Sequence, residues 1–108
     1  MKMKEIYWLG SSYDDLLDFS KEAKKDAGYN LHRLQIGLDP YDWKPMTSIG
    51  VGVREIRIHQ DGEYRIIYIA KFSEAIYVLH SFVKKTQKTK KSNLDIAKER
   101  LKLINRQR

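Results

Sequence analysis

The chain has 108 residues, a formal net charge of +7, and 42% hydrophobic and 32% charged residues, which predicts one globular domain over residues 1–108 rather than a disordered chain. Because cysteine is absent, disulfides and thiolate metal sites are excluded, and this composition fits a reducing cytosol. No apolar run approaches the ~18 residues of a transmembrane helix and the N-terminus resembles no signal peptide, so we expect a cytoplasmic protein without membrane contacts.

The N-terminal part is predicted to form one strand followed by helical segments. Residues 4–9 are rich in aromatic and β-branched side chains, which is typical of a short strand. Ser12 and Asp15 have the spacing of a helix capping box, and Ser20 is a second possible N-cap. Apolar residues at helical spacing continue to residue 38, so this part forms either one bent helix or two helices in succession.

A loop and three strands are predicted next. Residues 39–52 contain both prolines and two glycines and are expected to form a loop, with Trp43 and Met46 as packing anchors. The three strands have connections that are too short for crossovers, so they should be antiparallel neighbours. They are expected at residues 53–59, 63–71 and 75–85.

The first hairpin has two possible registers, and its apolar faces favour one of them. A two-residue turn would set Ile58 opposite Arg65, whereas a three-residue loop sets Ile58 opposite Tyr64 and Arg57 opposite Arg65. The three-residue loop is preferred, because it places Glu55, Arg57 and Arg65 together on one face. On that face Arg65 is expected to make few core contacts.

The second hairpin leaves two registers open. A shift of one residue in its loop decides which side chains of the last strand share a face with Arg65. The first alternative brings His80, Phe82 and Lys84 to that face. The second brings Ser81, Val83 and Lys85.

The C-terminal quarter carries the excess positive charge. Residues 84–108 hold ten Lys or Arg against two acids, whereas residues 1–83 have a net charge of −1. Ser92 and Asp95 predict the start of a final helix, whose apolar stripe recurs at helical spacing through Ile104. This asymmetry predicts a polyanionic partner, such as nucleic acid, an acidic protein or an anionic membrane. The alternative is a solvated, charged helix.

The predicted fold class is α+β. Two N-terminal helices, or one bent helix, would cover one face of a small antiparallel sheet. The other face would be concave and partly polar, and the final helix would lie at an edge.

The available chemistry points to an anion site without a metal or a cofactor. The sequence shows no Gly-rich phosphate loop, and its three histidines are too far apart for a metal motif. Cations that converge on a concave sheet bind a phosphodiester and stabilise a pentacovalent transition state. A lysine whose pKa is lowered by neighbouring cations exchanges protons nearer neutral pH, which allows RNA cleavage by the adjacent 2′-OH. The candidates are Arg57, Arg65, His80, Lys84 and Lys85.

Each candidate also has a structural alternative. Arg57 and Arg65 pair with Glu55 or Glu63 across the hairpin. His80 is a hydrogen-bonded structural histidine. The lysines of the linker are simply solvated; they are Lys88, Lys90 and Lys91.

Four segments in this order resemble one protein family. They are DWKPM (42–46), IGVGVREIRI (49–58), YRIIYIAKF (64–72) and VLHSFVKKTQKT (78–89). Over residues 7–100 the chain resembles the HigB-like, phage-associated group of the RelE/ParE toxin superfamily. The resemblance implies a RelE-like fold and the toxin half of a type II toxin–antitoxin module. Such toxins typically cleave mRNA on the ribosome and are neutralised by an antitoxin protein, often one with a helix-turn-helix domain.

The resemblance also implies roles for individual residues. Arg65 occupies the position of a phosphate-contacting arginine on the middle strand, Arg57 is the arginine of the E-I-R segment, and Lys84 stands at the end of the last strand with His80 further inside. Lys71, Lys85, Lys88, Lys90 and Lys91 are the predicted RNA-binding residues. No tyrosine follows Tyr77, so a mechanism with a C-terminal tyrosine is excluded. ParE-like members poison gyrase instead, so a gyrase-directed toxin and an inactive nucleic-acid-binding or antitoxin-binding member are the alternatives.

Overall fold

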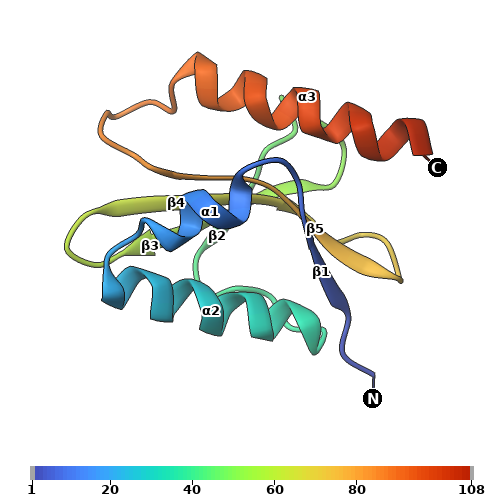
Figure 1. Ribbon diagram of the computed structural model, residues 1–108, viewed down its shortest axis with the longest axis horizontal. Helices are drawn as coiled ribbons and strands as arrows, with labels where there is room; N and C mark the ends of the chain where they lie inside the picture. Colours follow the sequence, from blue (N-terminus) through green and yellow to red (C-terminus); the bar gives the residue numbers. More distant parts are fainter. Residues whose placement is uncertain (1, 108) are drawn as a thin grey trace.

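The computed structural model describes residues 2–107, which form three helices and one five-stranded sheet (Figure 1). The predicted α+β class is confirmed. In chain order the elements are β1 (Glu5–Trp8), α1 (Ser12–Leu17), α2 (Lys21–Gln35), β2 (Trp43–Pro45), β3 (Val53–His59), β4 (Glu63–Ile69), β5 (Ala75–Val83) and α3 (Lys91–Gln107). None of the three helices in residues 2–107 has the length and apolar content that crossing a bilayer would require.

The sheet has the strand order β1-β5-β4-β3-β2 and is mixed rather than purely antiparallel. Strands β3, β4 and β5 are antiparallel neighbours, as predicted. Strand β1 pairs parallel with β5, and the chain passes through α1, α2 and three other strands between them. The predicted loop over residues 39–52 contains the short edge strand β2, which pairs with β3 and sets Trp43 opposite Ile56.

The registers of the two hairpins decide which side chains share a face. In β3–β4, Arg57 lies opposite Arg65, which confirms the three-residue loop. In β4–β5, Arg65 lies opposite Phe82, and a bulge follows beyond the pairing of Ile67 with His80. The open question of the second hairpin is thereby answered, because His80 and Phe82 share the Arg65 face.

Helices pack on both faces of the sheet, in three layers (Figure 1). Helices α1 and α2 cover one face, where their apolar side chains meet those of β3, β4 and β5. The expectation that α3 lies at an edge was wrong. Ala97, Leu101 and Ile104 pack on the second face of the sheet, because apolar side chains there, including Ile67 and Leu79, need a cover. The second face of the sheet is therefore open only where α3 does not cover it.

Helices begin close to all three predicted starts, but the predicted side-chain cap is confirmed at one of them. Ser20 caps α2, accepting a hydrogen bond from the Ala23 N–H at 3.2 Å, so α1 and α2 are two helices in succession. Ser12 is no cap, because its buried hydroxyl donates to the Val78 carbonyl of β5 at 3.2 Å. Helix α3 begins one residue before Ser92, which lies in its first turn.

Candidate functional site

A basic pocket opens at the end of the sheet where the β3–β4 hairpin and the segment after β5 meet. Figure 1 shows this segment, which leads into α3, at the same end of the molecule as the hairpin. The Lys84 N–H donates to the Glu63 carbonyl at 2.7 Å, which ties the two segments together. The pocket has a volume of about 460 Å³ and is lined by Arg57, Glu63, Arg65, Lys84, Lys85, Thr86 and Gln87. Its lining thus combines four cations with one carboxylate.

Arg65 lies at the base of the basic pocket and is 4% exposed. Its Nη2 lies 3.0 Å from Oε1 of Glu63, and its Nε lies 3.6 Å from Oε1 of Glu55. Its Nη1 donates to the Tyr64 carbonyl at 2.9 Å. The structural alternative of ion pairing is therefore confirmed for Arg65. The expectation of few core contacts was wrong, because the side chain is buried and contacts Glu55, Glu63 and the Tyr64 carbonyl.

Glu55 is fully buried beside Arg65. Within residues 2–107 neither of its carboxylate oxygens has a hydrogen-bond partner, so the ion pair with Arg65 is a charge contact rather than a hydrogen bond. A buried carboxylate is costly unless cations compensate it. Glu55 therefore favours positive charge at the base of the pocket, from Arg65 and from Lys84.

Lys84 has a pKa below that of an ordinary lysine. Burial is the main cause that lowers its pKa, and the nearby charge of Arg65 lowers it further, followed by the charges of Lys44 and Arg57. Glu55 acts in the opposite direction and raises the pKa. The outcome is an amine that reaches its neutral form at lower pH than an ordinary lysine.

A chain of charged groups leads from Arg65 to the surface. Glu63 contacts Arg65 on one side and Nδ1 of His59 on the other, at 2.8 Å. Nε2 of His59 lies 2.6 Å from Oδ2 of Asp42, and Oδ1 of Asp42 lies 4.0 Å from Nε of Arg57. The hydrogen bond to Glu63 is the largest cause that raises the pKa of His59, and the same bond lowers the pKa of Glu63. This chain therefore links the two arginines of the pocket, by a short contact at Arg65 and by a charge contact without a hydrogen bond at Arg57.

This network was not predicted from the sequence, although one signal for it was available. His59 and Glu63 are cross-strand partners in the register that was preferred for the first hairpin. Cross-strand partners of opposite charge interact. Asp42 could not be found in this way, because β2 was not predicted.

His80 lies behind the basic pocket rather than in its lining. It is 5% exposed, its ring stacks on Phe82 at 5.1 Å between centroids, and its Nε2 lies 2.8 Å from Oδ1 of Asn93. Burial is the largest cause that lowers the pKa of His80. This arrangement agrees with the structural alternative of a hydrogen-bonded histidine.

The predicted RNA-binding lysines are spread over several places. Lys85 lines the basic pocket, and Lys90 lines a neighbouring one. Lys88 is exposed on the segment between them, and Lys91 pairs with Asp95 at 2.9 Å. Lys71 follows the far end of β4, near α3, and so lies away from the other four.

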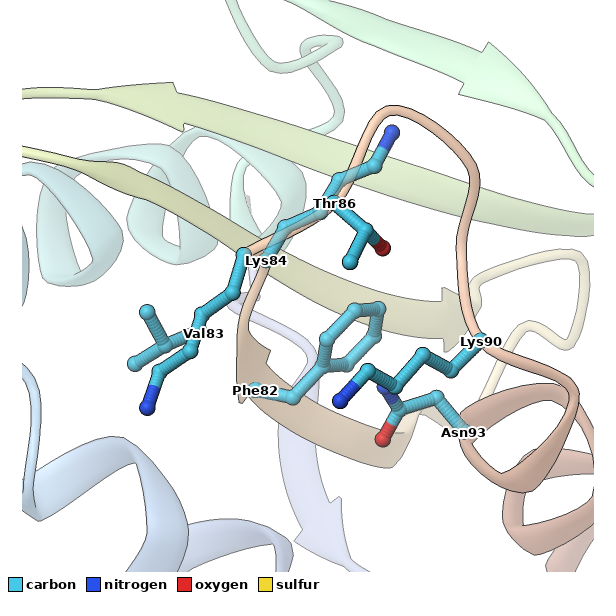
Figure 2. Close-up of a pocket in the computed structure, with 7 residues that line it drawn as sticks. Phe82, Val83, Lys84, Thr86, Lys90 and Asn93 are labelled. Atoms are coloured by element: carbon cyan, nitrogen blue, oxygen red, sulfur yellow. The ribbon is translucent and has the colours of Figure 1, made fainter.

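The neighbouring pocket, here called the Phe82 pocket, shares one wall with the basic pocket. It has a volume of about 220 Å³ and is lined by Phe82, Val83, Lys84, Lys85, Thr86, Lys90 and Asn93. Figure 2 shows the Phe82 ring between Thr86 on one side and Lys90 and Asn93 on the other. The sequence analysis did not predict a role for Asn93.

The arrangement suits the binding of a phosphodiester. Arg57, Arg65 and Lys84 supply donors and positive charge on one side of an open pocket, and Lys84 is suited to exchange a proton. Within residues 2–107 no group of three or more His, Cys, Asp or Glu side chains has an arrangement that could hold a metal ion.

One family model matches the part of the chain that contains the four segments quoted for the resemblance. A search of curated proteins finds no significant match to the sequence. The family model for phage-derived Gp49-like proteins (DUF891) matches residues 14–102, which include both pockets and most of α3. The chain therefore belongs to the Gp49-like family of phage-derived proteins, a family generally linked to RelE-like toxins.

Proposed function

We propose that this chain is the toxin of a type II toxin–antitoxin module and that it cleaves RNA in the basic pocket. The observation that carries the proposal is the convergence of Arg57, Arg65 and Lys84 on one open pocket, where Glu63 is the only acidic side chain among the described lining residues. The link of the Gp49-like family to RelE-like toxins supports the toxin part of the proposal.

In the proposed reaction the two arginines bind the scissile phosphate. A guanidinium stays charged at working pH and offers planar, paired donors to phosphate oxygens. Arg57 is the more accessible of the two, with a side chain that is 38% exposed. Arg65 lies opposite Arg57 at the base of the pocket, and its pairs with Glu55 and Glu63 fix the direction in which its remaining N–H donors point.

Lys84 is the proposed general base. Its neutral amine takes the proton of the 2′-OH, and the resulting oxygen attacks the adjacent phosphorus. The bond from phosphorus to the 5′-oxygen breaks, and that oxygen takes a proton from solvent. The products are a 2′,3′-cyclic phosphate and a 5′-hydroxyl end. The lowered pKa of Lys84 supports this role, since it increases the fraction of neutral amine.

The proposed substrate is mRNA on the ribosome, in the cytoplasm. The net charge of +8 over residues 84–108 favours a large RNA surface, and Lys85, Lys88 and Lys90 extend the positive charge of the pocket along the segment before α3. The proposed partner that neutralises the toxin is a cognate antitoxin protein, of the helix-turn-helix type.

Induced expression of the full chain in bacteria tests the proposal. We expect protein synthesis to stop before DNA replication does, and primer extension on an abundant mRNA to show new 5′ ends. A gyrase supercoiling assay runs in parallel. Intact mRNA together with gyrase inhibition would contradict the nuclease and favour the gyrase-directed alternative.

A further inference from the structure

The Phe82 pocket and the basic pocket together have the layout of a nucleotide site. They share Lys84, Lys85 and Thr86, so a ligand group in one lies next to a ligand group in the other. A nucleotide places a flat base beside its phosphate. If the basic pocket holds a phosphate, as the proposed function requires, the Phe82 pocket lies where the attached base would lie.

The floor of the Phe82 pocket is apolar and rigid. The Phe82 ring is 8% exposed and is supported from inside by the His80 ring, at 5.1 Å and an interplanar angle of 22°. Aromatic side chains provide a surface for nucleobases in RNA-binding proteins.

Asn93 offers a hydrogen-bond donor to this pocket. Its Oδ1 lies 2.8 Å from Nε2 of His80, and an amide oxygen accepts there, so Nε2 carries the hydrogen. Figure 2 shows this oxygen turned away from the Phe82 ring. The Asn93 amide nitrogen can therefore donate to a ligand in the pocket. His80 is a positioning residue, because its hydrogen bond fixes the orientation of the Asn93 amide.

Lys90 supplies a second donor. Lys90 directly precedes α3, and Asn93 lies three residues later in the first turn of that helix. Figure 2 shows the two side chains next to each other. Two donors match a base edge with two adjacent acceptors, and O6 and N7 of guanine form such an edge. Adenine presents an amino group beside N7, and that donor would face one of the two donors of the pocket without an acceptor. An asparagine reads adenine with its oxygen and nitrogen together, but His80 occupies the Asn93 oxygen.

We propose that the Phe82 pocket is a nucleobase subsite that selects guanine in the RNA bound by the basic pocket. This inference rests on the proposed function only for the binding of RNA and not for its cleavage.

The test measures binding of four fluorescent, fully 2′-O-methylated pentanucleotides to the full chain at fixed salt. They carry G, A, C or U between two uridines on each side, and the methyl groups prevent cleavage. We expect the G oligonucleotide to bind about tenfold more tightly than the A oligonucleotide. Equal affinities for the four oligonucleotides would overturn the subsite.

Asn93→Asp is the decisive variant. The carboxylate still accepts from His80 but replaces the amide donor with an acceptor, so the preference should move from G to the bases with an amino group, A and C. Ser92→Asp is the matched control. Ser92 is exposed, and the substitution adds the same negative charge outside the pocket lining. The control should weaken all four complexes alike and keep the preference for G. The same ranking in wild type and Asn93→Asp would contradict the proposal.

A second pair of variants leaves the hydrogen bond between His80 and Asn93 intact. Lys90→Gln removes a cation from an exposed side chain, so the fold should not change, and the G-to-A ratio should fall several-fold. Lys24→Gln, at an exposed position of α2 outside both pocket linings, should leave the ratio unchanged. A preference for G without cleavage in cells would contradict the proposed nuclease and support the subsite. Binding without any preference would overturn the subsite alone.

Discussion

Arg65 and Glu55 form a buried ion pair inside the sheet, with 3.6 Å between Nε and Oε1 and no more than 4% exposure of either side chain. Glu63 binds the outer end of the same guanidinium at 3.0 Å. A buried pair adds little net stability, but the loss of one partner leaves an uncompensated charge. Arg65 therefore serves the fold and also lines the basic pocket.

Removal of Arg65 alone should destabilise the protein. Arg65→Met leaves the buried Glu55 without its cation, and the expected loss is about 3 kcal/mol in the free energy of unfolding. Glu55→Gln/Arg65→Met should recover part of that loss, because no buried charge is left unpaired. Urea denaturation followed by circular dichroism measures both variants. A single variant as stable as the double variant would show that the pair does not matter for folding.

Lys84 should control the pH dependence of cleavage. Because its pKa is lowered, chiefly by burial and next by Arg65, the cleavage rate should rise with pH and level off below the ordinary pKa of a lysine. Lys84→Arg keeps the charge, but its guanidinium stays protonated and cannot accept the 2′-OH proton, so the rate should fall about a hundredfold and the rise should disappear. Single-turnover cleavage across a pH series measures this, with Lys88→Arg as the control. An unchanged pH profile in Lys84→Arg would exclude Lys84 as the base.

His59 should stabilise the fold only within a limited pH window. Its folded pKa is raised, chiefly by Glu63, so its contribution is full below the ordinary value of 6.5 and is lost as pH rises through the folded pKa. The pKa of Glu63 is lowered, so its contribution is present above 4.5 and is lost as pH falls through its folded pKa.

Thermal melts at pH 5.5 and pH 9 test this window. His59→Gln should lower the melting temperature at the acidic pH and have little effect at pH 9. The loss should stay below about 1 kcal/mol, because both side chains are more than 40% exposed and solvent screens them. His32→Gln, on the exposed part of α2, serves as the control. Equal losses at both pH values would contradict the assignment.

RNA binding should depend steeply on salt and should use Lys85 rather than Lys71. If about four phosphates are neutralised, log Kd should change with log salt with a slope near 3 in magnitude, at about 0.7 per phosphate of single-stranded RNA. Lys85→Gln should reduce that slope by about 0.7. Lys71→Gln should not change it, because Lys71 lies at the other end of β4. The reverse result would place the RNA on the opposite end of the sheet.

The sequence predicted the parts of the fold that follow from local alternation. The pairing of Arg57 with Arg65 could be predicted because one register alone aligns the apolar faces of the hairpin. The β4–β5 register could not, because a bulge beyond Ile67 changes it. The parallel pairing of β1 also escaped prediction, since it depends on contacts between segments about 70 residues apart.

The site was predicted in composition but not in geometry. Arg57, Arg65 and Lys84 meet as expected, because they share a face of adjacent strands. The burial of Arg65 and the contact of His80 with Asn93 were not predicted. The first depends on contacts with Glu55 and Glu63 and the second on the position of α3, and side-chain alternation does not show which part of a face is covered.

The most direct test of the central claim, that the basic pocket cleaves RNA, compares two arginines of β3. Arg54 and Arg57 have side chains that are 36% and 38% exposed, and each has an aspartate partner. Alternation along the strand turns Arg57 into the pocket and Arg54 to the opposite face, where it stacks on Trp43 at 4.1 Å.

Primer extension on an abundant mRNA, at matched protein levels, measures cleavage by Arg57→Gln and Arg54→Gln. The predicted result is a loss of roughly a hundredfold for Arg57→Gln and near-wild-type cleavage for Arg54→Gln. Equal cleavage by both variants would contradict the assignment of the basic pocket as the catalytic site.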